Sequence, residues 1–204
     1  LPVGFKLCVG RPIEVLALVD AMRRTDLAPD FITVDGGEGG TGAAPPEFSD
    51  SVGVPLDEAL TLVNNMLLGA GMRDRVTVIA SGKVHDSMSL VRTMALGADA
   101  CNAARGMMFA LGCIQALKCH TNTCPTGITT QKPELMEGLV VPDKAQRVAN
   151  YHAQTLTTAC EIAGAAGLAS LGDIRPEHVM RRTSRQQVES FAGACTEPGE
   201  QRAR

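Results

Sequence analysis

Three cysteines fall within one short stretch of the chain, at Cys113, Cys119 and Cys124, and proline follows the last of them. Cysteine thiolates are the usual ligands of iron–sulfur clusters, and closely spaced cysteines that end in Cys-Pro are typical of cluster-binding loops. Cys119 and Cys124 border the polar segment 120–123, where no apolar gap needs a cysteine to fill it. The spacing therefore predicts an iron–sulfur site. A single zinc ion with His120 as its fourth ligand is the alternative.

The remaining cysteines have a different setting. Cys8, Cys101 and Cys160 lie in apolar runs, where a cysteine serves as a small buried hydrophobe, and Cys195 lies in a polar tail. The total of seven is odd, and the chain opens with no signal-peptide pattern. These features favour reduced thiols or metal ligation over a disulfide framework.

A glycine-rich segment, Asp35–Pro45, directly follows an apolar run that we interpret as a strand. Its five glycines let the backbone approach a ligand closely and present N–H groups to it. No helical pattern opens within this segment, as a dinucleotide fingerprint would require. Because loops at the carboxyl ends of strands form the active face of such folds, we expect Gly36 and Gly37 to bind a cofactor and Glu38 to act in catalysis. An ordinary surface loop is the alternative.

Two more turns each close a predicted strand and open a predicted helix. Helix N-termini with glycine and a nearby cation bind phosphate, and barrel folds place such a site after their last two strands. The expected phosphate-binding residues of the two turns are Ser81, Gly82, Lys83, Ala104, Arg105 and Gly106.

Lys6 is unusual because it interrupts an apolar strand-like run. A charged residue there is costly unless it points into a polar site. We expect Lys6 to act in catalysis and to stabilise an anionic cofactor or a substrate carboxylate, with a solvent-facing lysine as the alternative. His85, His152 and His178 are interpreted as surface or helix-cap residues.

These residues must be positioned by alternating strands and helices. Apolar runs predict four buried parallel strands, at Gly4–Val9, Phe31–Val34, Val76–Ala80 and Ala98–Ala104. Helical patterns follow each of them, at Pro12–Arg24, Pro55–Gly71, Asp86–Leu96 and Gly106–Leu117. Four successive βα units predict an α/β fold with right-handed crossovers.

A closed (β/α)₈ TIM barrel needs eight strands and about 250 residues, so four strands account for half of one. An open half-barrel would expose an apolar edge strand, which proteins avoid. We therefore expect residues 1–142 to be the C-terminal half of a barrel, strands five to eight, with four strands preceding Leu1. Residues 143–204 should form C-terminal helices, at Asp143–Leu168 and Asp173–Thr183, and a polar tail from about Ala194.

Composition limits the partners. A net charge of −3 and a pI near 5.8 argue against a nucleic-acid partner, which requires a basic patch. No apolar run approaches the roughly 18 residues of a membrane span. With 45% apolar and 20% charged residues, the chain is expected to be globular and cytoplasmic, with no membrane partner.

Taken together, these residues resemble the flavin-binding synthase domain of the glutamate synthase family. The resemblance covers about Pro2–Leu168, and the cysteine segment is its most specific part. The matching stretches are Gly4–Leu7, Asp35–Ala43, Gly97–Ala100, Gly112–Ile128 and Thr130–Pro133.

In that family the barrel holds FMN, and three cysteines hold a 3Fe–4S cluster beside it. The resemblance therefore implies that Cys113, Cys119 and Cys124 are cluster ligands and that Lys6 lies near the isoalloxazine ring. It places the two phosphate turns at the FMN phosphate and the glycine-rich loop after Asp35 at the substrate side.

The resemblance also implies the reductive amination of 2-oxoglutarate to glutamate. Ammonia or glutamine would supply the nitrogen, and another protein or subunit would donate electrons. The segments Ala80–Gly82 and Ala104–Arg105 depart from the usual family sequence and resemble the stand-alone branch of the family. An FMN and iron–sulfur oxidoreductase acting on another amine or keto acid is therefore a second hypothesis. A non-catalytic truncated fragment with a structural metal site is a third.

Overall fold

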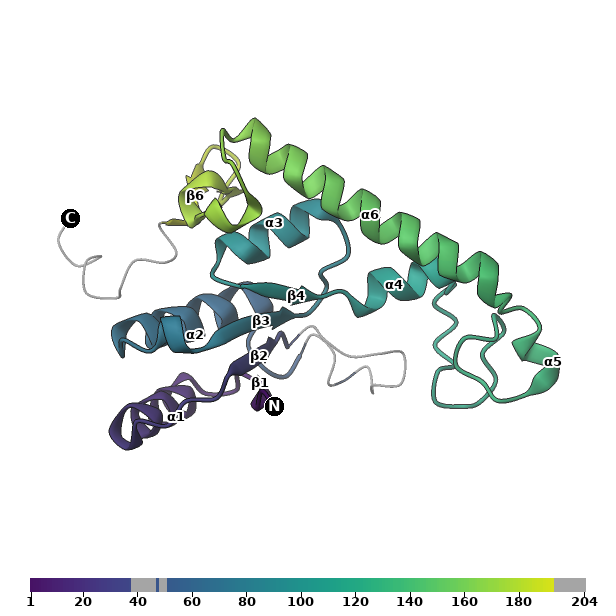
Figure 1. The fold of residues 1–204 in the computed structure, drawn as a ribbon, viewed down its shortest axis with the longest axis horizontal. Helices are drawn as coiled ribbons and strands as arrows, with labels where there is room; N and C mark the ends of the chain where they lie inside the picture. Colours follow the sequence, from purple (N-terminus) through teal and green to yellow (C-terminus); the bar gives the residue numbers. More distant parts are fainter. Residues whose placement is uncertain (38–46, 48–50, 193–204) are drawn as a thin grey trace.

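Strands and helices alternate through the first half of the chain, as Figure 1 shows for the computed structural model, which describes residues 1–37, 47 and 51–192. The strands are β1 (Gly4–Cys8), β2 (Phe31–Asp35), β3 (Thr77–Ser81), β4 (Ala100–Asn102), β5 (Met180–Arg182) and β6 (Val188–Ser190). The helices are α1 (Pro12–Thr25), α2 (Leu56–Gly69), α3 (Ser87–Ala95), α4 (Ala104–Leu111), α5 (Pro133–Met136) and α6 (Val141–Ala165). Single 3₁₀ turns lie at Arg73–Arg75, Leu171–Asp173 and Pro176–His178.

The first four strands form one parallel sheet in the order β1-β2-β3-β4. Each strand pairs with the next one along the chain, and a helical connection separates each pair, as a parallel sheet requires. The predicted α/β class and the four predicted strands are confirmed. The bounds differ from those expected by a few residues, most at β4, which is limited to three residues.

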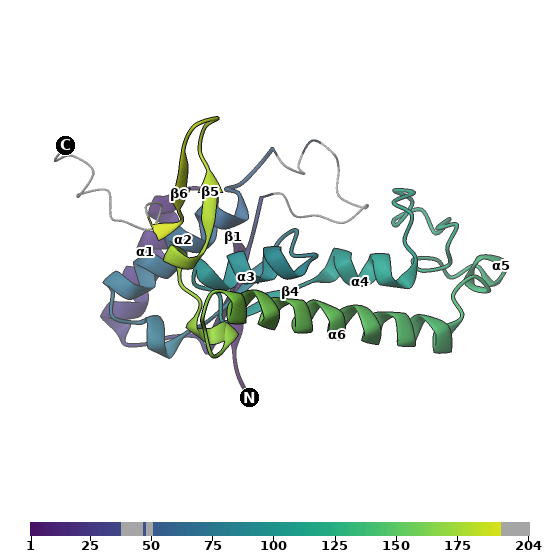
Figure 2. The ribbon, with the colours of Figure 1, turned by 90° about the horizontal axis from the view of Figure 1, so that it is seen from above.

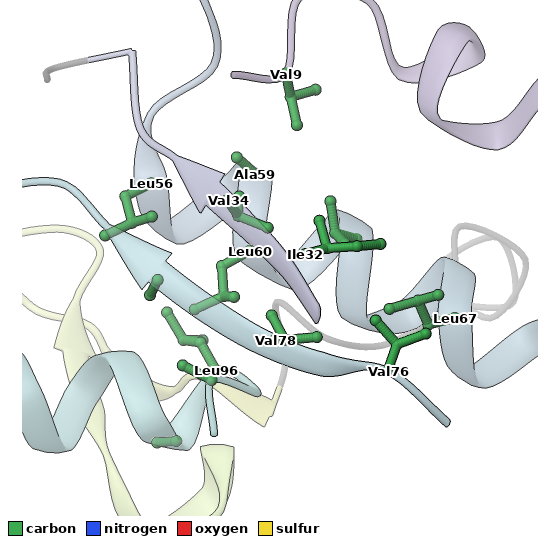
Figure 3. Packing of buried hydrophobic residues seen from close by; sticks show 14 of the residues in the cluster. Val9, Ile32, Val34, Leu56, Ala59, Leu60, Leu67, Val76, Val78 and Leu96 are labelled. Atoms are coloured by element: carbon green, nitrogen blue, oxygen red, sulfur yellow. The ribbon is translucent and has the colours of Figure 1, made fainter. Parts of the chain in front are cut away.

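Alternation along the strands divides the sheet into an apolar and a polar face. Ile32, Val34, Val78 and Ala80 are at most 1% exposed and pack against the helical layer in one core cluster. Figure 3 shows Leu60 of α2 and Leu96 in the same cluster as these strand residues. Burying each such aliphatic side chain contributes roughly 1.5–3 kcal/mol. The residues between them on β2 and β3 point to the other face, which is where the candidate site lies.

The long helix α6 crosses the outer side of both α3 and α4 (Figures 1 and 2). Polar contacts fix it there: the Tyr151 hydroxyl donates to the His85 carbonyl at 2.6 Å, and the Ser87 hydroxyl donates to the Thr155 carbonyl at 3.0 Å. A Cβ on Gly106 would lie 2.1 Å from the Tyr151 hydroxyl oxygen, so α4 can approach α6 only with glycine there. None of the helices among the described residues is long and apolar enough to cross a membrane.

Helix α4 is shorter than the sequence predicts. It ends at Leu111 because Gly112 adopts a left-handed conformation with φ of 102°. The Gly112 N–H donates to the Phe109 carbonyl and the Cys113 N–H donates to the Met108 carbonyl, the pair of bonds that defines a Schellman cap. The expected continuation to Leu117 is therefore wrong, and the chain enters the cysteine segment directly from this cap.

The helix expected at Asp173–Thr183 is also wrong. Pro176 opens only a single 3₁₀ turn, and the following residues pair as the antiparallel hairpin β5–β6. Val179 and Phe191 are both buried, and the Phe191 N–H donates to the Val179 carbonyl. The hairpin buries one apolar residue beside each strand, and this tertiary packing favours it over the expected helix. The expected tail from Ala194 lies outside the described residues.

Candidate functional site

Four residues from four strands lie in register at the carboxyl edge of the sheet. Cys8 pairs with Asp35, Asp35 with Ser81, and Ser81 with Asn102. Their side chains point away from the apolar core, because their strand neighbours Val34 and Ala80 are buried in it. The parallel sheet thus gathers thiol, carboxyl, hydroxyl and amide groups along one line, at the edge where α/β folds bind ligands.

Lys6 belongs to the same polar face. Its ammonium lies 2.8 Å from the carboxylate of Asp35, and its side chain is 59% exposed. The pair joins neighbouring strands diagonally, since Lys6 is in register with Thr33, two residues before Asp35. The Lys6 side chain is thus largely exposed, and its ammonium forms an ion pair with a carboxylate.

A cavity of about 570 Å³ opens beside this edge, between the ends of β3 and β4 and the helices α4 and α6. Its lining includes three of the predicted site residues, Lys6, Ser81 and Ala104. The helices add polar groups that the sequence did not indicate as site residues, among them Tyr151 and His152 of α6. The sequence did not indicate that Asp35 pairs with Lys6, or that Asn102, His85 and these two line the cavity, because these placements depend on register and on the packing of α6. Only the position of Asp35 and Asn102 at strand ends signals them in the sequence.

The two predicted phosphate turns differ in what they offer an anion. At the start of α3, the Asp86 carboxylate already accepts the Ser89 N–H at 2.7 Å, and its charge would repel a phosphate. Helix α3 begins only at Ser87, several residues after β3 ends. At the start of α4, by contrast, Ala103 is the N-cap and offers no capping side chain, and Ala103 and Ala104 line the cavity. The positive end of α4 is therefore the better anion site.

Several glycines expected to contact a cofactor have packing roles. The Gly36 N–H donates to the Ser81 carbonyl and the Gly37 N–H to the Val54 carbonyl, both at 2.8 Å. A Cβ on Gly37 would lie 2.6 Å from the Gly53 carbonyl oxygen, and Gly82, with φ of 144°, faces the Gly36 backbone. Gly37 thus packs against the end of its own β2–α2 connection, whereas Gly36 and Gly82 let the loops after β2 and β3 touch each other.

The other predicted residues stand as follows. Lys83 is exposed with a left-handed φ of 47°, and Arg105 is exposed on the first turn of α4. Gly106 is buried against Tyr151. Neither Lys83, Arg105 nor Gly106 is among the described residues that line the cavity. Glu38 lies outside the described residues.

The three cysteines of the predicted cluster all lie in the segment between α4 and α6. Cys113 follows the Schellman cap of α4 directly, and the Gln115 N–H donates to its sulfur at 3.5 Å. Cys119 lines a second cavity of about 530 Å³, together with His120 and Thr129. Cys124 is only 9% exposed and lies before Pro125. Helix α6 then leads back over α4 (Figure 1).

The surroundings of Cys124 favour its thiolate, which is the form that binds iron. Burial acts to raise its pKa, but hydrogen bonds from the side chain of Thr126 and from the backbones of Thr129 and Thr126 outweigh burial and lower the pKa to about 6. Cys101 shows the opposite effect, since burial alone raises its pKa to about 12. Among these two cysteines only Cys124 is suited to be a metal ligand.

Within the described residues, no three His, Cys, Asp or Glu side chains converge on a point where a single metal ion would sit. The zinc alternative with His120 is therefore not assembled in this geometry. A multi-iron cluster makes a different demand, because each thiolate binds a different iron and the sulfurs surround the cluster instead of meeting at one point. Three cysteines in one segment, one with a favoured thiolate and another beside a cavity, fit that donor set.

Comparison with known proteins gives consistent matches. Residues 1–169 match the model of the conserved region in glutamate synthase. The chain is 45% identical over 181 residues to the glutamate synthase large subunit-like protein YerD of Bacillus subtilis, covering 89% of this chain and 34% of that protein. It is 40% identical over 146 residues to the archaeal glutamate synthase [NADPH] of Methanocaldococcus jannaschii, covering 72% of this chain and 29% of that protein. The chain thus spans about a third of the length of these relatives.

Solved structures support the fold. A variant of flavocytochrome b2 with pyruvate bound superposes on 97% of this chain with a TM-score of 0.54, although the sequences are only 12% identical. The matched part is 37% of that protein. At this level of identity the likeness concerns the fold alone.

Proposed function

The chain belongs to the glutamate synthase family, and from this premise we propose that it is part of an oxidoreductase that uses FMN and a 3Fe–4S cluster to aminate 2-oxoglutarate reductively to glutamate. The observation that carries the proposal is the position of α4. Its N-terminus borders the cavity at the sheet edge, and its C-terminus ends at Cys113. Eight helical residues span about 12 Å, so a flavin phosphate and a cluster ligand would lie at the two ends of one short helix.

We propose further that the parallel sheet is half of a (β/α)₈ barrel, strands five to eight. The likeness of nearly the whole chain to about a third of flavocytochrome b2 supports this, as does the chain's match to about a third of its relatives. Among the described strands β1 pairs only with β2, and β4 only with β3. Each therefore has an edge to which a further strand of a barrel could bind.

In this proposal the chain's own residues bind and orient the flavin. The N–H groups at the start of α4 receive the phosphate, together with the turn at Ser81. Lys6, held by Asp35 at 2.8 Å, presents its ammonium on the polar face, where it stabilises negative charge on the ring or on a substrate carboxylate. When bound and reduced by electrons from the donor, FMN would supply a hydride to the imine formed from 2-oxoglutarate and ammonia.

The remaining partners follow from the same proposal. Cys113, Cys119 and Cys124 hold the cluster, which would pass electrons from a donor protein or subunit toward the flavin. Ammonia, or glutamine through a separate glutaminase, would supply the nitrogen. A cytoplasmic location agrees with a cluster that needs reduced thiols.

The test is a comparison of cofactor content among cysteine variants. Cys113→Ser, Cys119→Ser and Cys124→Ser should each lower the iron and acid-labile sulfide of anaerobically purified protein. Cys160→Ser, at an exposed position on α6 outside the segment, is the matched control and should keep both. Full-length wild-type protein without flavin, iron or sulfide would overturn the proposal.

A second candidate keeps the cofactors and changes the substrate. The turn residues Ser81 and Arg105, which depart from the usual family sequence, favour it, because they belong to the segments expected at the flavin phosphate. Its test is the reoxidation of reduced flavin by a panel of keto acids with ammonia. If 2-oxoglutarate fails and another keto acid succeeds, the second candidate replaces the first.

A further inference from the structure

The sulfur of Cys124 has a threonine hydroxyl beside it. The Thr126 hydroxyl oxygen lies 3.3 Å from the Cys124 sulfur, within hydrogen-bond distance for sulfur. Either atom could donate in the free protein. A thiolate bound to iron has no proton, so in the loaded protein the threonine hydroxyl must be the donor.

The backbone holds Thr126 in this position. Cys124, Pro125, Thr126 and Gly127 form a turn closed by the Gly127 N–H, which donates to the Cys124 carbonyl at 3.2 Å. Proline at the second position and glycine at the fourth are typical of a type I turn. A Cβ on Gly127, whose φ is 76°, would lie 2.4 Å from the Leu135 carbonyl oxygen. The turn thus packs closely against α5, with the hydroxyl of Thr126 beside the sulfur.

A second threonine adds an independent observation. The hydroxyl oxygen of Thr129 is buried, yet it makes no hydrogen bond of acceptable geometry to any described residue. A buried hydroxyl without a partner destabilises the protein, because it has lost its hydrogen bonds to water and gained none. Thr129 also lines the cavity beside Cys119, the second of the three cysteines. A sulfur atom of a bound cluster would give this hydroxyl the acceptor it lacks.

From these contacts we infer that Thr126 and Thr129 are positioning residues of the iron–sulfur site, whose hydroxyls donate to cluster sulfurs and raise its reduction potential. The inference rests on the cluster of the proposed function. Hydrogen bonds to cluster sulfurs stabilise the reduced state, which carries one more negative charge, and so raise the potential. The same donors orient the Cys124 ligand.

The experiment uses an isosteric pair of substitutions at each position. Thr126→Val keeps the shape and removes the hydroxyl, whereas Thr126→Ser keeps the hydroxyl and removes the methyl group. Thr129→Val and Thr129→Ser are the equivalent pair. Thr123→Val is the matched control, because the Thr123 hydroxyl is adjacent in sequence but bonds the Thr121 hydroxyl at 2.6 Å.

Two readouts are measured on anaerobically purified full-chain protein: iron and sulfide content, and the midpoint potential from a redox titration followed by electron paramagnetic resonance. We expect the valine variants to have a lower potential than wild type or to lose the cluster. The serine variants and Thr123→Val should match wild type. Valine variants that keep both the cluster and its potential would overturn the inference, and so would a loss seen with serine but not with valine, because that pattern indicates packing.

Failure of the proposed function gives a separate result. Wild-type protein that contains no iron or sulfide refutes the cluster itself and this inference with it. If the protein contains the cluster but its reduction potential is unchanged in the valine variants, only the inference about the threonines is refuted.

Discussion

Cys101 and Cys124 carry the same side chain, yet their surroundings drive their pKa values in opposite directions. Cys101, on β4, packs against the core, and burial raises its pKa to about 12. For Cys124 the hydrogen bonds from Thr126 and Thr129 overcome burial and bring the pKa to about 6. At the residue scale, the hydrogen-bond donors around its sulfur, and not its degree of burial, give Cys124 the lower pKa of a candidate ligand.

Asp86 provides a test at the same scale. Its carboxylate accepts the Ser89 N–H at 2.7 Å, and the Ser89 hydroxyl receives the Asp86 N–H at 3.1 Å, which closes a capping box at the start of α3. Asp86→Ala should lower the free energy of unfolding by about 1 kcal/mol, whereas Asp86→Asn keeps an acceptor oxygen and should lower it less. Chemical denaturation of the two variants checks this. Equal losses would contradict the capping role.

The charge of Asp86 adds a pH dependence. The hydrogen bond from the Ser89 backbone is the main cause that lowers the pKa of Asp86 below its ordinary value. A carboxyl with a depressed folded pKa contributes stability above its unfolded pKa and loses it as pH falls through the folded value. The stability difference between wild type and Asp86→Asn should therefore be largest near neutral pH and fade below about pH 4.

At the scale of elements, α4 depends on a cap that its sequence signals through one glycine. The left-handed Gly112 allows both cap bonds, and the second of them uses the N–H of Cys113. The cap that ends the helix therefore also holds Cys113, the first predicted ligand, in position. Lys144 and Arg147 of α6 lie near this cap, at 3.5 and 3.8 Å from a Cβ placed on Gly112, where cations complement a helix C-terminus.

Gly112→Ala tests this coupling. A left-handed alanine costs about 1–2 kcal/mol, and relief of that strain should displace Cys113. We expect a lower melting temperature together with a lower iron content.

Gly164→Ala is the matched control, because Gly164 lies inside α6 with no atom within 4 Å of an added Cβ. Alanine there should stabilise the protein by about 0.5–1 kcal/mol and leave iron unchanged. If Gly112→Ala keeps full iron content at its reduced stability, the cap does not position Cys113.

At the scale of the whole molecule, the edge of the sheet opposite the candidate site is tied together by Arg73. Its guanidinium donates to the Asn64 side chain at 2.8 Å, to the Gly97 carbonyl at 3.0 Å and to the Asp99 carboxylate at 2.8 Å. The other Asp99 oxygen accepts the Val78 N–H at 2.7 Å. One side chain, 17% exposed, therefore joins α2, β3 and the connection into β4.

Arg73→Lys should lower the free energy of unfolding by about 2–3 kcal/mol, because a lysine cannot reproduce the forked contacts and leaves partly buried acceptors unpaired. Arg75→Ala is the control. The Arg75–Asp26 pair, at 2.6 Å, is exposed, so its loss should have little effect. Denaturant unfolding measures both, and the cofactor content of folded Arg73→Lys protein should stay unchanged. A smaller loss for Arg73→Lys than for Arg75→Ala would contradict this assignment.

The sequence predicted the parallel βα framework well, because buried strands such as Phe31–Asp35 carry their signal in consecutive apolar residues. It also located the cysteine segment, since the types and spacing of ligands are local properties. Contacts between distant segments were not predictable in this way. The Lys6–Asp35 pair depends on strand register, and the contribution of Tyr151 to the cavity depends on where α6 packs.

The difference between local signals and contacts of distant segments also explains where the secondary structure predicted from the sequence was wrong. The end of α4 at Gly112 had a local signal, the glycine itself, that competed with apolar residues continuing beyond it. The hairpin β5–β6 arises from burial of Val179 and Phe191, which are twelve residues apart. Its formation is a property of tertiary packing.

The geometry of helix α4 also limits which insertions and deletions this region can accept. Adding one residue to an α-helix turns everything after it by about 100° and moves it by about 1.5 Å. In α4 such an insertion would rotate Cys113 away from its present direction while Ala104 stayed at the cavity. Substitutions along the exposed side of α4 leave this relation intact. The region should therefore tolerate exchanges of residues far better than insertions or deletions.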